Sequence, residues 1–182
     1  MQTDEQLVAS YSDSRQPEAL EQLVDRYIGR IRGLAYQMVL DPTAADDLTQ
    51  EVFLRVVRGL STFNGRSKFS TWLYRLAMNT ARSYLANRNR SPVDFHSELP
   101  ESAQTRDPQP ESAAMEAELE TAVEVALGEL SSKLRGAIVL ISFQNLDAKE
   151  AARIEGCTTA TMYWRIHEAR RQLEKRLRKY ML

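Results

Sequence analysis

Apolar residues recur every three or four positions along most of the chain, which is the spacing of one face of an α-helix. Near the start, Thr3 and Gln6 have the spacing of a capping box, which predicts a short first helix. Pro17 suits the first turn of a longer helix. The apolar positions of this second helix are Leu20, Leu23, Val24, Tyr27, Ile31, Leu34 and Met38.

Asp41 followed by Pro42 is typical of a helix N-terminus and predicts a third helix. The apolar positions of this third helix are Leu48, Val52, Phe53 and Val56. The Asn64-Gly65 pair interrupts the pattern, so we expect a loop at about 60–70. A fourth helix should then run to about residue 90. One of its faces is suited to packing and consists of Leu73, Leu76, Ala77, Thr80 and Tyr84.

The helical pattern fails between about residues 89 and 110, where prolines and polar residues predominate. We interpret 91–111 as a flexible linker between a domain at 1–90 and a second domain at 112–182. The alternative is a long surface loop within one domain.

The second domain shows helical patterns at about 112–130, 132–143, 147–154 and 159–180. No segment has the alternation of a strand. The sequence therefore predicts an all-α fold of two small helical domains.

Composition excludes several classes of protein. The chain has 182 residues and a single cysteine, Cys157, so an internal disulfide and a cysteine-based zinc site are both excluded. We expect a reducing, cytoplasmic setting, no secretory signal in the polar N-terminus and no membrane insertion. No cluster of residues has metal-ligand or catalytic spacing, so we expect neither a cofactor nor an enzyme. Asp46, Asp47 and Glu51 are explained by a solvated acidic face.

The net charge of −1 conceals zones of opposite sign. Residues 61–90 contain six basic residues and no acid, whereas residues 91–130 contain ten acids and one arginine. Residues 156–182 contain seven basic residues and two acids. Two basic zones separated by an acidic one are compatible with a polyanionic partner.

The last two predicted helices have the pattern of a helix-turn-helix. Ala152 allows a close helix crossing, Gly156 suits the turn, and the last helix has an apolar stripe opposite a polar face. That polar face could enter a DNA major groove. A helical hairpin with a solvated face remains the alternative. The candidate DNA-binding residues of this helix are Thr159, Thr161, Trp164, Arg165, Glu168 and Arg171.

The fourth predicted helix combines aromatic rings with arginines, and no acid lies nearby. We expect an exposed Trp72 on this face, where rings stack on unpaired bases and arginines bind phosphates. The alternative is that Trp72 belongs to the core. The candidate residues here are Phe63, Asn64, Arg66, Lys68, Trp72, Arg75, Asn79 and Arg82. The loop residues among them could line a pocket for an extruded base.

Residues 45–85, beginning ADDLTQEVF, resemble the second conserved region of bacterial sigma factors of the extracytoplasmic-function (ECF) type. The segment that ends TATMYWRIHEARRQL resembles their fourth region. The resemblance implies a protein that directs core RNA polymerase to promoters and assists promoter opening. It implies that the aromatic-basic segment captures a base of the minus-ten element and that the last helix reads the minus-thirty-five element. It allows an anti-sigma factor as a further partner. It also implies polymerase contacts at Asp47, Leu48, Gln50, Glu51 and Phe53.

Some positions depart from the family pattern. Ala160 stands where a glycine is usual, Trp164 where a small polar residue is usual, and Ala151 and Glu155 replace larger apolar residues. These departures make the recognised upstream sequence hard to transfer from relatives. The rival interpretation is a helix-turn-helix regulator that binds DNA without polymerase.

Overall fold

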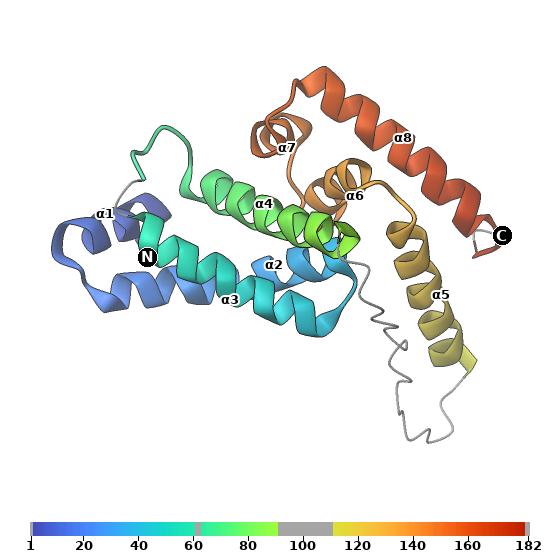
Figure 1. Cartoon of the computed structure of the whole chain (residues 1–182), viewed down its shortest axis with the longest axis horizontal. Coiled ribbons are helices and arrows are strands. Elements are labelled where there is room, and N and C mark those ends of the chain that lie inside the picture. Colours follow the sequence, from blue (N-terminus) through green and yellow to red (C-terminus); the bar gives the residue numbers. More distant parts are fainter. Residues whose placement is uncertain (1, 61–62, 91–110, 181–182) are drawn as a thin grey trace.

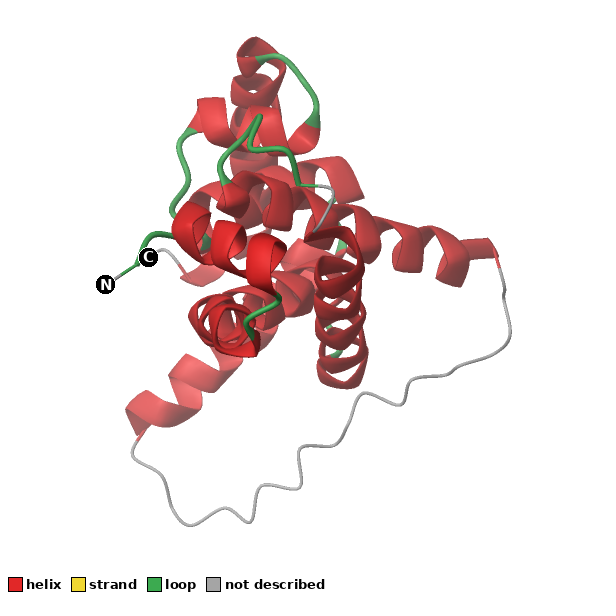
Figure 2. Cartoon of the chain, turned by 90° about the vertical axis from the view of Figure 1, so that its left-hand side faces the viewer, coloured by secondary structure: helices red, strands yellow, loops and turns green. Residues whose placement is uncertain are grey.

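The computed structural model describes residues 2–60, 63–90 and 111–180, and every regular element within these ranges is a helix (Figures 1 and 2). The first half contains α1 (Asp4–Ser14), α2 (Pro17–Val39), α3 (Pro42–Gly59) and α4 (Phe69–Arg90). The second contains α5 (Glu111–Gly128), α6 (Ser132–Ile138), η2 (Val139–Phe143), α7 (Ala148–Glu155), α8 (Thr159–Leu177) and η3 (Arg178–Tyr180). The predicted all-α class is confirmed. The predicted linker falls almost entirely on residues 91–110, outside the described ranges.

Local capping explains where the helices begin. Thr3 and Gln6 form the predicted capping box of α1. The carboxylate of Asp41 accepts a hydrogen bond from the Ala44 amide at 3.0 Å, which starts α3. Asp147 caps α7 in the same way. Each of these side chains satisfies a backbone N–H that has no partner within its helix.

Helix α2 is the centre of the first half, with α1, α3 and α4 packed around it. The core is continuous across these helices and excludes water from their facing sides. Most residues of the predicted apolar stripes are buried, as helical periodicity requires. The largest fully buried side chains of this half are Phe69, Leu7, Leu23, Ile31, Leu34, Met38, Leu60, Leu73 and Met78.

The second half consists of short helices that pack against α8. Met162, Ile166 and Ala169 form the buried stripe of α8, whereas Leu173 and Leu177 are only half-buried. The segment predicted as one helix at 132–143 is divided into α6 and the π-helical turn η2. A π-helical turn contains a wider backbone hydrogen-bond spacing than an α-helix, which periodicity does not reveal.

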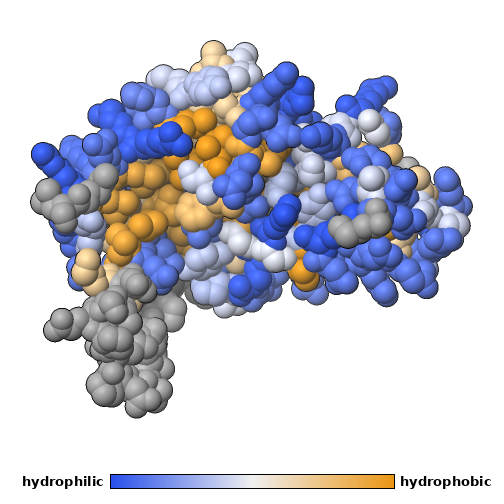
Figure 3. All heavy atoms as spheres, turned by 180° about the vertical axis from the view of Figure 1, so that it is seen from behind, coloured by the Kyte–Doolittle hydropathy of each residue, from blue (hydrophilic) through white to orange (hydrophobic). Residues whose placement is uncertain are grey.

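The two halves pack against each other, and this contact was not predicted. Helix α4 contacts α7, which lies beside it in Figure 1, and α2 contacts η2. Val139 and Leu140 of the second half belong to the same buried cluster as Met38 and Leu73 of the first. The opposite face of the molecule shows an apolar area near its middle, bordered by hydrophilic surface (Figure 3).

Arg135 joins the halves through a buried charge. One guanidinium nitrogen donates to the Met38 carbonyl at 2.6 Å, and another donates to the Gly128 carbonyl at 2.6 Å. These carbonyls lie at the C-terminal ends of α2 and α5, where the helix dipole favours a cation. Burial lowers the pKa of Arg135. The arginine thus supplies hydrogen bonds to helix ends that would otherwise be buried unpaired.

We expect Arg135→Met to lower the free energy of unfolding by about 3 kcal/mol, because it leaves buried carbonyl groups unpaired. Urea denaturation followed by circular dichroism measures this loss. Lys133→Met, on the exposed side of the same helix, is the matched control and should change stability by less than about 0.5 kcal/mol. Equal stabilities for the two variants would contradict the role assigned to Arg135.

Candidate nucleic-acid interface

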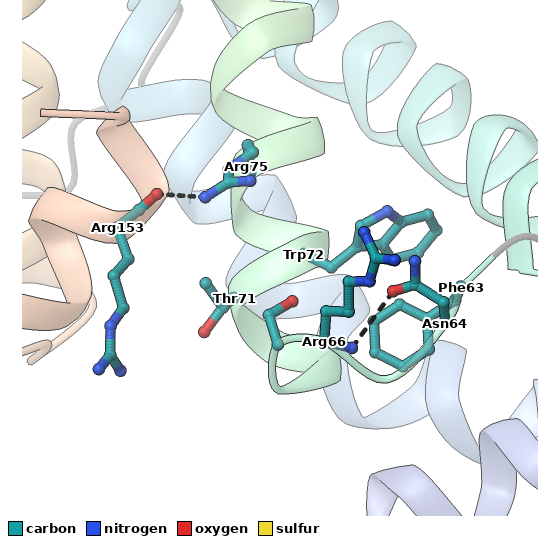
Figure 4. Close-up of a pocket in the computed structure, with 8 residues that line it drawn as sticks. Phe63, Asn64, Arg66, Thr71, Trp72, Arg75 and Arg153 are labelled. Carbon is teal, nitrogen blue, oxygen red and sulfur yellow. Dashed lines mark hydrogen bonds between the residues drawn. The ribbon is translucent and has the colours of Figure 1, made fainter.

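A pocket of about 480 Å³ lies between the loop before α4 and the first turns of that helix. Figure 4 shows the aromatic rings of Phe63 and Trp72 on one side and Arg75 near Arg153 on the other. The pocket lining consists of Phe63, Asn64, Arg66, Ser67, Thr71, Trp72, Arg75 and Arg153. Most of these residues belong to the first basic zone, and Arg153 comes from α7 in the second half.

Trp72 is half-buried rather than exposed, which corrects the expectation from sequence. Its ring centroid lies 5.6 Å from that of Phe63 and 5.8 Å from that of Phe69. Its ring also rests on Gly59, where an added Cβ would come within 3.3 Å. Trp72 therefore forms the wall of the pocket while its packing fixes the ring in place.

The loop that forms the pocket rim has a defined local conformation. The side-chain oxygen of Asn64 accepts a hydrogen bond from the Arg66 amide at 3.2 Å. Gly65 has a φ of +69°, a left-handed conformation that glycine adopts without strain. The Asn-Gly signal in the sequence thus predicted the turn, and the turn places Phe63 and Arg66 on the pocket.

Three cations in α4 or directly before it contact the second half, although Lys68 and Arg75 also remain exposed to solvent. The Lys68 ammonium lies 3.2 Å from the Glu150 carboxylate. Arg75 donates to the Arg153 carbonyl, and Arg82 pairs with Glu155. Asn79, on the same face of α4, is exposed. The predicted minus-ten residues therefore lie together, but part of their charge is already paired.

The recognition-type helix α8 begins at the cap of Thr158, whose hydroxyl accepts a hydrogen bond from the Thr161 amide. Trp164 is 62% exposed, and so is its neighbour Tyr163, which sequence reasoning did not select. Arg165 differs, because its side chain is 13% exposed and lies 3.0 Å from Glu155. The remaining candidates on this helix are half-buried or exposed, namely Thr159, Thr161, Glu168 and Arg171.

Helix α3 presents a mixed acidic and apolar face. Asp47 and Gln50 are exposed and Glu51 and Phe53 are half-buried, but Leu48 is buried in the core. Leu48, expected as a polymerase contact, packs in the core. Leu54 and Val57 of the same helix are 44% and 39% exposed, although apolar residues on a helix are expected to face the core.

Known proteins match both halves of this geometry. The model of sigma-70 region 2 matches residues 23–91, and the model of sigma-70 region 4 matches residues 120–173. The RNA polymerase sigma-H factor of Pseudomonas aeruginosa is 34% identical over 183 aligned residues, which cover 96% of this chain and 93% of the relative. The chain is an RNA polymerase sigma factor of the ECF type.

Other relatives and solved structures agree with this assignment. The ECF RNA polymerase sigma-E factor of Haemophilus influenzae is 32% identical, with 98% of this chain and 97% of the relative covered. The structure of CnrH in complex with the cytosolic domain of CnrY has a TM-score of 0.73 at 25% identity, with 97% of each chain covered. The sigma factor RpoE of Bartonella quintana, in complex with the anti-sigma factor NepR, shares the fold with a TM-score of 0.66 at 23% identity, with 87% of this chain and 96% of that chain covered.

As a sigma factor, the chain directs core polymerase to promoters and assists their opening, and it is not an enzyme. The rival interpretation of a regulator that acts without polymerase is thereby set aside. Within the described ranges, no group of three or more His, Cys, Asp or Glu side chains could hold a metal ion. None of the described helices has the length and hydropathy needed to cross a membrane.

Glu168 carries the most perturbed carboxylate on the α8 face of the sigma factor. Arg171 donates two hydrogen bonds to it, at 2.8 and 2.9 Å, and Gln172 donates a third at 2.7 Å. These contacts, with Arg171 as the largest cause, lower the pKa of Glu168 from 4.5 to about 2. Part of the positive charge of α8 is thus neutralised locally.

We expect Glu168 to titrate near pH 2 in the folded sigma factor. Because its pKa is lowered by folding, the contribution of the pair to stability is complete above about pH 4.5 and disappears as the pH falls toward 2. Carbon-detected NMR of the side-chain carboxyl group measures the midpoint. Arg171→Leu should move that midpoint back toward 4.5, whereas Arg170→Leu should leave it low. A midpoint near 4.5 in the unmodified protein would contradict the hydrogen bonding described.

Proposed function

We propose that the sigma factor divides its work among three surfaces. The outer face of α3 docks on core polymerase, the pocket beside α4 receives a base of the minus-ten element, and the N-terminal half of α8 reads the minus-thirty-five duplex. We also propose that 1–90 and 112–182 act as separate domains on the promoter, joined by the linker at 91–111. The observation that carries this division is the pocket, because it combines fixed aromatic rings with the arginines Arg66, Arg75 and Arg153.

The docking role of α3 is supported by its exposed apolar side chains. Leu54 and Val57 lie on the same side of the helix as Asp47, Gln50 and Glu51, at intervals of three or four residues. Exposed leucine and valine side chains next to carboxylates are typical of a surface that binds another protein through that protein's apolar and basic groups. Phe53, half-buried at its margin, could contribute both to the core and to the contact.

The base-binding role of the pocket is supported by its size and lining. Its wall is formed by the half-buried rings of Phe63 and Trp72, which are fixed by mutual packing. Ring faces of this kind stack on a base only after the base has left the duplex. Asn64 of the lining and Asn79, farther along α4, carry amide groups that can pair with base edges. Arg66 of the lining and the neighbouring Lys68 are exposed for phosphate contact.

The duplex-reading role of α8 is supported by its cap and by the side chains near its start. Thr159 and Thr161 lie in the first turn, where a recognition helix contacts bases. Trp164 is exposed and can contact a thymine methyl group, while Arg165 has the fork geometry for guanine. Arg171, farther along α8, is the candidate phosphate contact, and its positive charge is paired with the carboxylate of Glu168.

Core polymerase and promoter DNA are the partners of this activity, and we place the protein with them in the cytoplasm. An anti-sigma factor is a further proposed partner. The similar structure of CnrH contains a bound domain of CnrY, which supports a comparable partner for the present chain. Run-off transcription with core polymerase on genomic fragments tests the proposed function as a whole. Transcripts that do not depend on the added protein would contradict it.

We expect Leu54→Asp to weaken the complex with core polymerase by at least tenfold, about 1.4 kcal/mol, because a carboxylate replaces an apolar contact. Fluorescence anisotropy of labelled protein titrated with core polymerase measures the affinity. Leu119→Asp is the matched control, since Leu119 is 41% exposed on α5, away from α3. The same loss in both variants would place the docking surface elsewhere.

Phe63→Ala and Asn79→Ala should reduce open-complex formation while leaving polymerase binding nearly unchanged, because the pocket acts on an unpaired base. Permanganate reactivity of thymines in the minus-ten region measures opening. Because Asn79 is exposed, Asn79→Ala removes a base contact without disturbing the fold. Phe63 is half-buried, so Phe63→Ala needs a parallel denaturation curve. Asn87→Ala, on an exposed part of α4, is the control. Normal thymine reactivity in both Phe63→Ala and Asn79→Ala would show that the loop before α4 is only structural.

A further inference from the structure

The side of α4 assigned to DNA contacts the second half of the same chain through three cations. Lys68 pairs with Glu150, Arg75 donates to the backbone of Arg153, and Arg82 pairs with Glu155. Each of these partners belongs to α7, the helix that precedes the recognition helix. The two elements that would hold separate promoter segments are therefore bound to each other.

Glu155 is the most enclosed of these partners. Its side chain is 1% exposed, and its two oxygens bind different helices. One accepts from Arg82 of α4, and the other accepts from Arg165 of α8 at 3.0 Å. We refer to these three residues as the Glu155 bridge. Both arginines in it belong to the sets proposed to contact promoter DNA.

The Glu155 carboxylate and DNA would compete for the same guanidinium groups. A guanidinium that donates to a buried carboxylate cannot turn the same N–H groups toward a phosphate or a guanine. Arg165 is only 13% exposed in this arrangement, although the neighbouring Trp164 is 62% exposed. Loss of Arg82 while the halves stay in contact would leave one oxygen of the buried Glu155 carboxylate unpaired, so the bridge favours the closed arrangement once it has formed.

Gly136 gives an independent sign that this contact is closely fitted. A Cβ at Gly136 would lie 2.7 Å from the Met78 Cε atom, 3.1 Å from an Arg82 guanidinium nitrogen and 3.3 Å from a Glu155 oxygen. Helix α6 therefore approaches α4 at a position that only glycine fits without rearrangement. By contrast, a Cβ at Gly29, which lies on α2, would meet nothing within 4 Å.

We propose that Glu155 is an internal substitute for DNA phosphate, which holds the free sigma factor closed and masks Arg82 and Arg165. This inference rests on the proposed DNA-binding roles of those two arginines. The exposed face of α3 is not involved in the bridge, so polymerase can dock on the closed chain. Separation of the two halves then releases Arg82 for the promoter, and Arg165, which lies in the same half as Glu155, exchanges the carboxylate for DNA.

Distance measurement on the free protein tests the closed state without reference to DNA. Spin labels at Ser83 and Lys175, both exposed, are attached to cysteines in a Cys157→Ser background of the full chain. We expect one narrow distance distribution in the parent protein and a broad, longer one in Glu155→Gln. Gly136→Leu should open the chain in the same way without removing a charge, and Gly29→Leu should not.

Binding to a short labelled duplex of mixed sequence, at fixed salt and without polymerase, tests the masking. Glu155→Gln should bind at least tenfold more tightly than the parent. Glu174→Gln removes the same charge from an exposed position of α8 and is the control for net charge. Gly136→Leu should also bind more tightly than Gly29→Leu. Melting curves identify any variant that is unfolded. If either Glu155→Gln or Gly136→Leu is unfolded, the other of the two tests the masking.

A broad distance distribution in the parent protein would overturn the closed state. A Glu155→Gln or Gly136→Leu chain that opens but binds duplex no better than its control would overturn the masking. Run-off transcription by the parent protein with core polymerase reports on the proposed function separately, because it does not depend on whether the free chain is open or closed.

Discussion

The contact between the two halves, in which α2 and α4 meet α6, η2 and α7, is the constraint on which the arrangement of the whole chain depends. It buries polar groups as well as apolar ones, so its groups must meet in specific pairs. Arg135 joins the ends of α2 and α5, and Glu155 joins α4 to α8. Because each charge is enclosed and depends on a partner from another helix, partial opening would leave charges unpaired. This favours two discrete arrangements, closed and open.

The closed arrangement also relates the three functional surfaces to one another. The α3 face remains accessible, the pocket beside α4 is bordered by Arg153 of α7, and α8 is held through Arg165. A partner that binds α3 would thus meet a chain in which the arginines proposed to contact DNA are already paired. Promoter contact then requires a rearrangement that costs free energy, and polymerase or promoter binding must supply it.

The sequence was informative about the elements because their signals are local. The capping box of Thr3 and Gln6, the cap of Asp41 and the turn at Gly65 all act within a few residues, and the structure shows each of them. The helical periodicity likewise predicted most of the core side of α2, α3, α4 and α8. The pocket residues could be selected together because the loop and the first turns of α4 are adjacent in sequence.

The remaining features depend on contacts between residues far apart in the chain, and no local pattern encodes them. Trp72 was expected to be exposed because its neighbours are arginines, yet Phe63, Phe69 and Gly59 enclose it. Leu48 packs in the core, whereas Leu54 and Val57 on the same helix are exposed, and the sequence pattern did not predict that exposure. Glu155 was noted only as a departure from the family.

The structure of the complex with core polymerase and an opened promoter tests most directly whether the two halves separate on the promoter. We expect Glu155 to be separated from Arg82, with α4 on the melted strand and α8 on the upstream duplex. An intact contact between α4 and α7 in that complex would contradict it.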